Sequence, residues 1–156
     1  MSWDTIFQLA NGWAFLMWIV LIFLPRKPFP LAVVFYAGVG LLCLAYASLM
    51  ALLLTGTIDP VPVADSEGGG NFTSIEGVRA LFASDGGIVI GWIHYLAFDL
   101  FAGLWIAKDA DSKGFSRILQ APILALTFVA GPAGLLIWFI IRERRARAAA
   151  GLRKVN

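Results

Sequence analysis

Two side chains able to transfer protons, His94 and Asp99, stand close together inside a long apolar run. A central aspartate costs about 2.5–3.5 kcal/mol even on mild membrane-insertion scales, so such residues are by default hypotheses for a functional site. A third acid, Asp85, begins the run, where Ser84 and Asp85 also fit a helix N-cap. We predict acid–base chemistry with His94, Asp99 and Asp85 as candidate catalytic residues, against structural hydrogen bonding as the alternative.

The helical period places these candidates on two faces. At about 100° per residue, Asp85, Trp92, Tyr95 and Asp99 share one face. His94 lies about 140° away from Asp99. A bend or two neighbouring helices would be needed to bring both around one chamber, which is the arrangement that we predict. Trp92 and Tyr95 are then candidate ligand contacts.

A second polar stripe lies near the N-terminus. Asp4, Gln8 and Asn11 are spaced by four and three residues, and the same face continues with Phe15 and Trp18. This pattern indicates a pocket that is polar at its mouth and apolar at depth. We predict that Asn11 and Gln8 contact the ligand, although Asp4 could simply cap a helix.

His94 shares its stripe with Gly87 and Gly91, which have the spacing GxxxG. Small residues at this spacing allow another helix to approach closely. The stripe therefore predicts a tight helix–helix contact, which could join two copies of the chain in a homo-oligomer.

The composition indicates an integral membrane protein. Hydrophobic residues make up 60% of the chain, which is well above the apolar content of soluble domains. Charged residues make up 14%, and the mean hydropathy is +0.81. The expected location is multi-pass in the lipid bilayer, which would be the inner membrane in a bacterium. No fold that binds nucleic acid is visible. One histidine and one cysteine suit neither bis-histidine haem nor a usual zinc site, so we expect no metal and no cofactor.

The predicted fold class is all-α, a four-helix transmembrane bundle forming a single domain over 1–156. Each span takes about 20 residues and must be helical. The expected spans are 3–24, 31–54, 85–107 and 118–141, with an extramembrane loop at 55–84 and a basic tail at 142–156.

Two further features qualify this plan. Apolar residues at 75, 78, 81 and 82 predict a short interfacial helix before the third span, after a flexible stretch that contains Glu67-Gly-Gly-Gly70. Pro132 within Gly131-Pro-Ala-Gly134 predicts a kink in the fourth span, because proline removes a backbone donor.

The orientation stays open. Arg26 and Lys27 after the first span favour a cytoplasmic position for that end, with the N-terminus outside. With four spans, however, the basic tail would lie on the same side as the N-terminus. That side then carries slightly more basic residues in total, which favours a cytoplasmic N-terminus.

Four stretches carry a resemblance to a known family. They are Leu81-Phe-Ala-Ser-Asp85, Trp92-Ile-His94, Asp99-Leu-Phe-Ala102 and Gly131-Pro-x-Gly134. The chain resembles the small membrane family of plant neoxanthin synthase, the abscisic-acid-deficient-four-like family, which includes bacterial relatives of unknown function. The resemblance is specific over 79–141 and weaker in the first span, where Asn11 and Pro25-Arg26 fit.

The resemblance implies a four-helix membrane domain and, in the plant member, cofactor-independent isomerisation of an epoxy-carotenoid to an allene. His94 would be the base, and Asp99 or Asp85 the acid or the residue that orients the imidazole. The plant sequences have an arginine where this chain has Leu104-Trp105, so we expect a carotenoid-like or other isoprenoid ligand rather than the plant substrate itself.

Two other functions stay open. One is a non-catalytic membrane binding or accessory protein for isoprenoid pigments or a partner complex. The other is a small proton-coupled transporter, which four short helices without a repeat disfavour.

Overall fold

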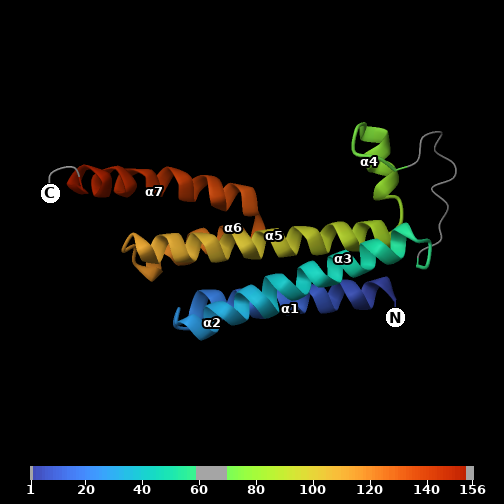
Figure 1. The fold of residues 1–156 in the computed structure, drawn as a ribbon, viewed down its shortest axis with the longest axis horizontal. Coiled ribbons are helices and arrows are strands. Elements are labelled where there is room, and N and C mark those ends of the chain that lie inside the picture. The colour runs from blue at the N-terminus through green and yellow to red at the C-terminus, as the bar shows by residue number, and fades with distance from the viewer. Residues whose placement is uncertain (1, 59–69, 154–156) are drawn as a thin grey trace.

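The computed structural model describes residues 2–58 and 70–153, and within these ranges all regular structure is helical. Figure 1 shows long helices lying side by side, with a shorter helix across one end. In chain order the elements are α1 (Trp3–Phe23), α2 (Pro28–Ala32), the π-helix η1 (Val33–Gly40), α3 (Leu41–Leu54), α4 (Ile75–Leu81), α5 (Asp85–Ser112), α6 (Arg117–Val129) and α7 (Gly131–Arg153).

Three stretches of the described chain are long and apolar enough to cross a membrane. They are α1 with 21 residues, the continuous helix Pro28–Leu54 with 27, and α5 with 28. At about 1.5 Å per residue each reaches the ~30 Å of a hydrocarbon core. These helices match the first three predicted spans, with boundaries that differ by a few residues.

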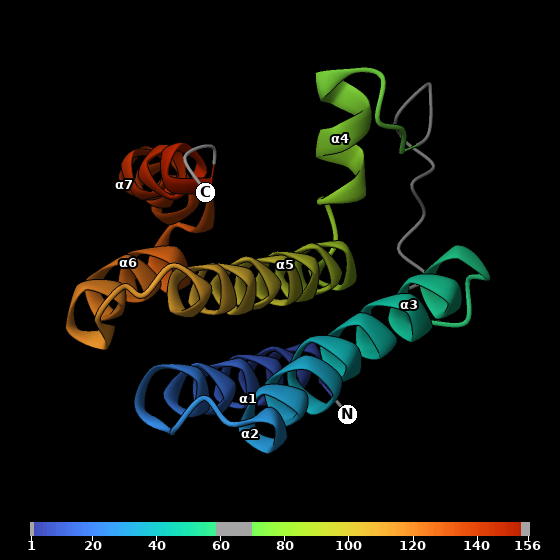
Figure 2. The same ribbon diagram turned by 60° about the vertical axis from the view of Figure 1, so that its left-hand side comes forward.

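α1 and α5 run in the same direction, and the helix Pro28–Leu54 runs against them (Figures 1 and 2). At one end, Asp4 of α1 and Asp85 of α5 line the same pocket. At the other, Arg26, which follows α1, donates to the Asp111 carboxylate of α5 at 2.9 Å. We call these the Asp85 end and the Ser112 end of the molecule.

α5 lies at the centre, and half of its 28 residues are buried. Ile93, Leu100 and Ile106 are among its fully covered side chains, packed with Trp18 and Leu21 of α1. The Trp13 indole of α1 donates to the Ala37 carbonyl of η1 at 2.8 Å. These contacts hold the three long helices as one packed unit.

The short helix predicted before the third span is present. α4 begins after Ser74, whose hydroxyl accepts from the Gly77 backbone N–H, and it lies across the direction of α5 (Figure 2). Phe72, shortly before α4, and Ile75, its first residue, are strongly exposed. An interfacial position of this helix stays a prediction. The flexible stretch predicted before α4 lies largely in 59–69, outside the described residues.

The prediction of one kinked fourth span over 118–141 is wrong. α6 ends at Val129, Ala130 leaves the helical region with φ −150° and ψ 75°, and α7 begins at Gly131. Pro132 is the second residue of α7, where a missing backbone N–H breaks no intrahelical bond. The proline therefore starts a new helix instead of bending an old one, and a four-span bundle is not confirmed.

α6 and α7 form a helical hairpin beside the Ser112 half of α5 (Figure 1). Gly134 of α7 lies so close to Thr127 of α6 that an added Cβ would meet the threonine backbone. Beyond the hairpin tip α7 continues as a helix to Arg153, so the stretch predicted as a basic tail is helical over its described part.

α5 also extends beyond the predicted boundary at 107 and ends at Ser112. The Asp109 carboxylate pairs with Lys113 at 2.5 Å and with Arg142 at 2.8 Å. Because these pairs satisfy its charge, the acid is tolerated within the helix. The chain turns only at Gly114, which has a positive φ of 68°.

Candidate functional site

Asp99 lies at the middle of α5, directly against the tip of the α6–α7 hairpin. Only 7% of the residue is exposed. Its carboxyl group interacts with the Gly131 backbone N–H at the start of α7 and with the Tyr95 side chain. Among the described residues, its Oδ2 is buried with no hydrogen-bond partner. One oxygen of a buried acid is therefore available to hold a proton or to meet a ligand.

A row of polar and aromatic groups leads from Asp99 towards α1. The Tyr95 hydroxyl donates to the Val129 carbonyl at 2.9 Å, and the Tyr95 ring stacks on Trp92 with centroids 5.0 Å apart. The Trp92 indole donates to the Asn11 side-chain oxygen at 3.0 Å. We call Asn11, Trp92, Tyr95 and Asp99 the Asp99 row. The structure thus brings together three predicted ligand contacts and one predicted catalytic acid.

Further aromatic rings flank this row. Phe7 lies 5.8 Å from Trp92 between centroids, and Phe128 of α6 lies 6.0 Å from Phe15. Phe7, Phe15 and Trp92 are all more than a third exposed. Flat, partly uncovered rings suit contact with an elongated apolar molecule.

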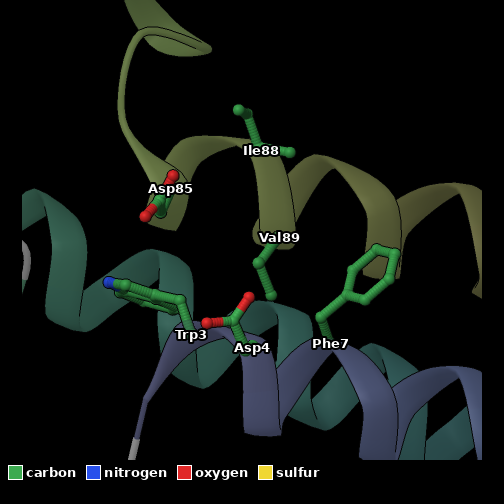
Figure 3. A pocket seen from close by; sticks show the side chains of 6 residues that line it. All are labelled: Trp3, Asp4, Phe7, Asp85, Ile88 and Val89. Atoms are coloured by element: carbon green, nitrogen blue, oxygen red, sulfur yellow. The ribbon is translucent and has the colours of Figure 1, made fainter.

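A pocket of about 230 Å³ lies at the Asp85 end, next to the row (Figure 3). Asp4 and Asp85 project from α1 and α5 into it, and both are exposed. Phe7 lines this pocket and also contacts Trp92. Of the stripe Asp4, Gln8 and Asn11 predicted to line a pocket, only Asp4 lines this one. Asp85 lies at this pocket and not beside Asp99, and ligand binding by the stripe stays a prediction.

His94 lies on a different face of α5, so the structure does not show the predicted chamber shared with Asp99. The imidazole is exposed and packs against Tyr46 of α3 and Phe98, with ring centroids 5.3 and 4.6 Å apart. The helical period alone sets this separation, because α5 is an unbroken helix across both residues.

Two other predictions concern residues outside the Asp99 row. Gln8 is exposed and takes no part in the described contacts of the row. Gly87 and Gly91 pack within the chain, where added Cβ atoms would meet the Leu81 carbonyl and the Phe82 ring. The glycine face is thus covered by the end of α4, and a homo-oligomer through it stays a prediction.

A polar network at the Ser112 end was not predicted from the sequence. Arg26 donates to Asp111, to the Ala107 carbonyl at 3.3 Å and to the Gln120 side chain. Burial lowers the pKa of Arg26, and the Asp111 carboxylate acts in the opposite direction. Gln120 could have indicated this network in the sequence, because it is a polar residue within an apolar segment. In the structure it is fully buried.

Asp109 forms the second part of this network. Its carboxylate accepts from the Trp138 indole at 3.1 Å and from the Arg142 guanidinium at 2.8 Å. The two clusters tie the start of α6 and the middle of α7 to the end of α5. Most of their charged groups bond to one another, although the Arg26 Nε is buried without a partner among the described residues. We assign both clusters to positioning the hairpin.

The arrangement can place one carboxyl group and one phenol beside an apolar, aromatic surface. In the described part of the chain, no cluster of three His, Cys, Asp or Glu side chains could hold a metal ion. The chemistry that the row itself offers is proton transfer and hydrogen bonding.

Comparison with known proteins shows the family. The family described as ABA DEFICIENT 4-like matches residues 5–138, most of the chain, and the chain belongs to it. The match covers α1, α5, α6 and the beginning of α7, and so contains the entire Asp99 row. No curated protein and no solved structure matches the chain.

Proposed function

We propose that this ABA DEFICIENT 4-like chain is a multi-pass membrane protein that binds a carotenoid-like isoprenoid and isomerises it by acid–base chemistry. The observation that carries the proposal is Asp99, a buried acid with an uncommitted oxygen at the end of an aromatic row. Family membership supports the ligand class, and the three long apolar helices support the membrane location.

The ligand would lie along the Asp99 row. Its apolar chain would contact Phe7, Trp92 and Phe15, which are partly uncovered. The Asp4–Asp85 pocket would receive a polar end group at the membrane surface. A long conjugated molecule suits this path because it is rigid and flat, so it loses little conformational entropy on binding.

The reaction needs one proton donor and one proton acceptor. For an epoxide, the Asp99 carboxylic acid gives its proton to the ring oxygen, and a C–O bond breaks. The resulting carboxylate takes a proton from the adjacent chain carbon, whose C–H electron pair forms the new double bond. The product is an isomer and the acid is regenerated, so no redox cofactor is required.

Access to Asp99 requires movement of the hairpin tip, because Oδ2 is covered. Val129 at the tip is 71% exposed, and Ala130 is non-helical. The segment is therefore the part of the hairpin that can open at lowest cost. Tyr95 would guide the tip, since its hydroxyl binds the Val129 carbonyl.

One observation favours an accessory protein instead. His94, the predicted base, does not face Asp99, and the Asp99 contact with Gly131 would also serve to fix the hairpin. In that case the chain would bind the isoprenoid and leave it chemically unchanged.

Expression in a host that makes epoxy-carotenoids tests the proposal. Cells with the wild-type chain should accumulate an isomer of equal mass that is lacking in cells with Asp99→Asn and with empty vector. Chromatography with mass detection measures this, and immunoblotting confirms equal amounts of both variants. Unchanged pigments that co-purify with the wild-type chain would support the accessory function, and unchanged pigments without co-purification would contradict both.

A further inference from the structure

The α6–α7 hairpin has the dimensions of a segment that enters a membrane and returns to the same side. α6 has 13 residues, about 20 Å, and the apolar part of α7, 131–141, is about 16 Å long. The first is about two thirds, and the second about half, of the ~30 Å hydrocarbon core. Neither helix is long enough to cross the membrane alone. The two helices run in opposite directions, so together they do not form one spanning segment.

The contacts with α5 fix this reversal. α6 runs against α5, because Gln120 contacts Asp111 at 3.0 Å while Val129 contacts Tyr95 at 2.9 Å. α7 runs along α5, because Gly131 lies at Asp99 and Arg142 at Asp109. The tip thus lies beside the middle of α5, and both hairpin ends lie at its Ser112 end (Figure 1).

The backbone polar groups at the hairpin tip have partners within the protein, as a position inside the membrane requires. Non-helical backbone inside a membrane is tolerated only where protein satisfies its polar groups. Here the Tyr95 hydroxyl binds the Val129 carbonyl, and the Asp99 carboxyl meets the Gly131 N–H. Gly131 and Gly134 are buried, which brings the two hairpin arms and α5 into close contact.

The hairpin also changes where the charges lie. With three crossings and a returning hairpin, every basic residue of the described chain except Arg79 lies at the Ser112 end. These residues are Arg26, Lys27, Lys108, Lys113, Arg117, Arg142, Arg144, Arg145, Arg147 and Arg153. The acids are divided evenly in the described chain, with Asp4, Glu76 and Asp85 at the Asp85 end and Asp109, Asp111 and Glu143 at the Ser112 end. The near balance of basic residues expected for four spans thus becomes a strong asymmetry of basic residues.

We propose that α6–α7 is a re-entrant hairpin, so that the chain crosses the membrane three times and sets its basic Ser112 end against the anionic headgroups of the cytoplasmic leaflet. Basic residues near span ends favour the cytoplasmic side, and that leaflet attracts them electrostatically. The Asp85 pocket and the N-terminus then face the opposite side. This inference rests on the membrane location in the proposed function, and it is independent of catalysis.

Cysteine labelling tests the hairpin. In a Cys43→Ser background, single variants Thr57→Cys, Ser112→Cys and Gly151→Cys are treated with a membrane-impermeant maleimide on intact cells and after lysis. We expect Thr57→Cys to label on intact cells, and Ser112→Cys and Gly151→Cys to label only after lysis.

The labelling patterns test the hairpin and the orientation separately. Labelling of Ser112→Cys and Gly151→Cys on opposite sides would overturn the hairpin, because four spans require it. Labelling of both on intact cells, with Thr57→Cys protected, would overturn the orientation. Retention of each variant in alkaline-washed membranes tests insertion itself, so a failed membrane location is recognised separately.

Discussion

The two faces of α5 use ionisable side chains in different ways. On one face, Asp99 is buried and is held by the hairpin tip and by Tyr95. On the other, His94 is exposed and touches only the rings of Tyr46 and Phe98 among its described ring contacts. Both residues look equally unusual in an apolar run, so residue type alone does not separate them. The neighbours that each side chain meets do.

The largest difference in stability is expected between two glycines. Gly131→Ala should lower the free energy of unfolding by about 1–3 kcal/mol, because its Cβ would overlap the buried Asp99 carboxyl. Gly91→Ala, on the His94 face, should be neutral or stabilising, since Phe82 is 46% exposed and can move aside. Thermal unfolding in detergent micelles compares the two, and equal losses would contradict the difference between the faces.

A smaller effect is expected within the Asp99 row. Tyr95→Phe removes the hydroxyl that binds the Val129 carbonyl, and it should cost about 0.5–1.5 kcal/mol. Tyr36→Phe is the matched control, because Tyr36 is 74% exposed. If both variants melted at the wild-type temperature, the tip would not depend on this hydrogen bond.

A comparable loss is expected for Trp92→Phe, which keeps the aromatic stack but loses the bond to Asn11. The cost should be about 1 kcal/mol in the free protein. Asn11→Ala should cost a similar amount, and the double variant should cost less than the sum of the two, because both changes remove one bond. Strict additivity in the same unfolding assay would contradict a shared interaction.

The smallest effect is expected for His94→Ala. The imidazole is exposed, and its ring contacts with Tyr46 and Phe98 are worth about 0.5–1 kcal/mol. If the free energy of unfolding fell as much as in Gly131→Ala, His94 would contribute as much to stability as the Asp99 face, which would contradict this difference.

Much of the fold could be predicted from the sequence, because it depends on local signals. The helical period put Asp85, Trp92, Tyr95 and Asp99 on one face, and Ser74 and Ser84 begin helices as their residue types favour. The family resemblance was confirmed over most of the chain.

The hairpin could not be predicted, because its cause is not local. Gly131-Pro132 is compatible with a kink or with a new helix, and the contacts from Asp99 and Tyr95, some 30 residues earlier, favour the second. The same limit applies to His94. The close contact at its glycine stripe was predicted, but the groups that cover Gly87 and Gly91 are the Leu81 carbonyl and the Phe82 ring at the end of α4, not a neighbouring long helix.

The most direct test of the central claim is a comparison of initial rates with purified protein and an epoxy-carotenoid in detergent. We expect Asp99→Asn to lower the rate about 10²–10⁴-fold, the usual contribution of a general acid–base group, and His94→Ala to keep the rate within about twofold of wild type. Loss of turnover in His94→Ala, with Asp99→Asn folded and fully active, would contradict the central claim.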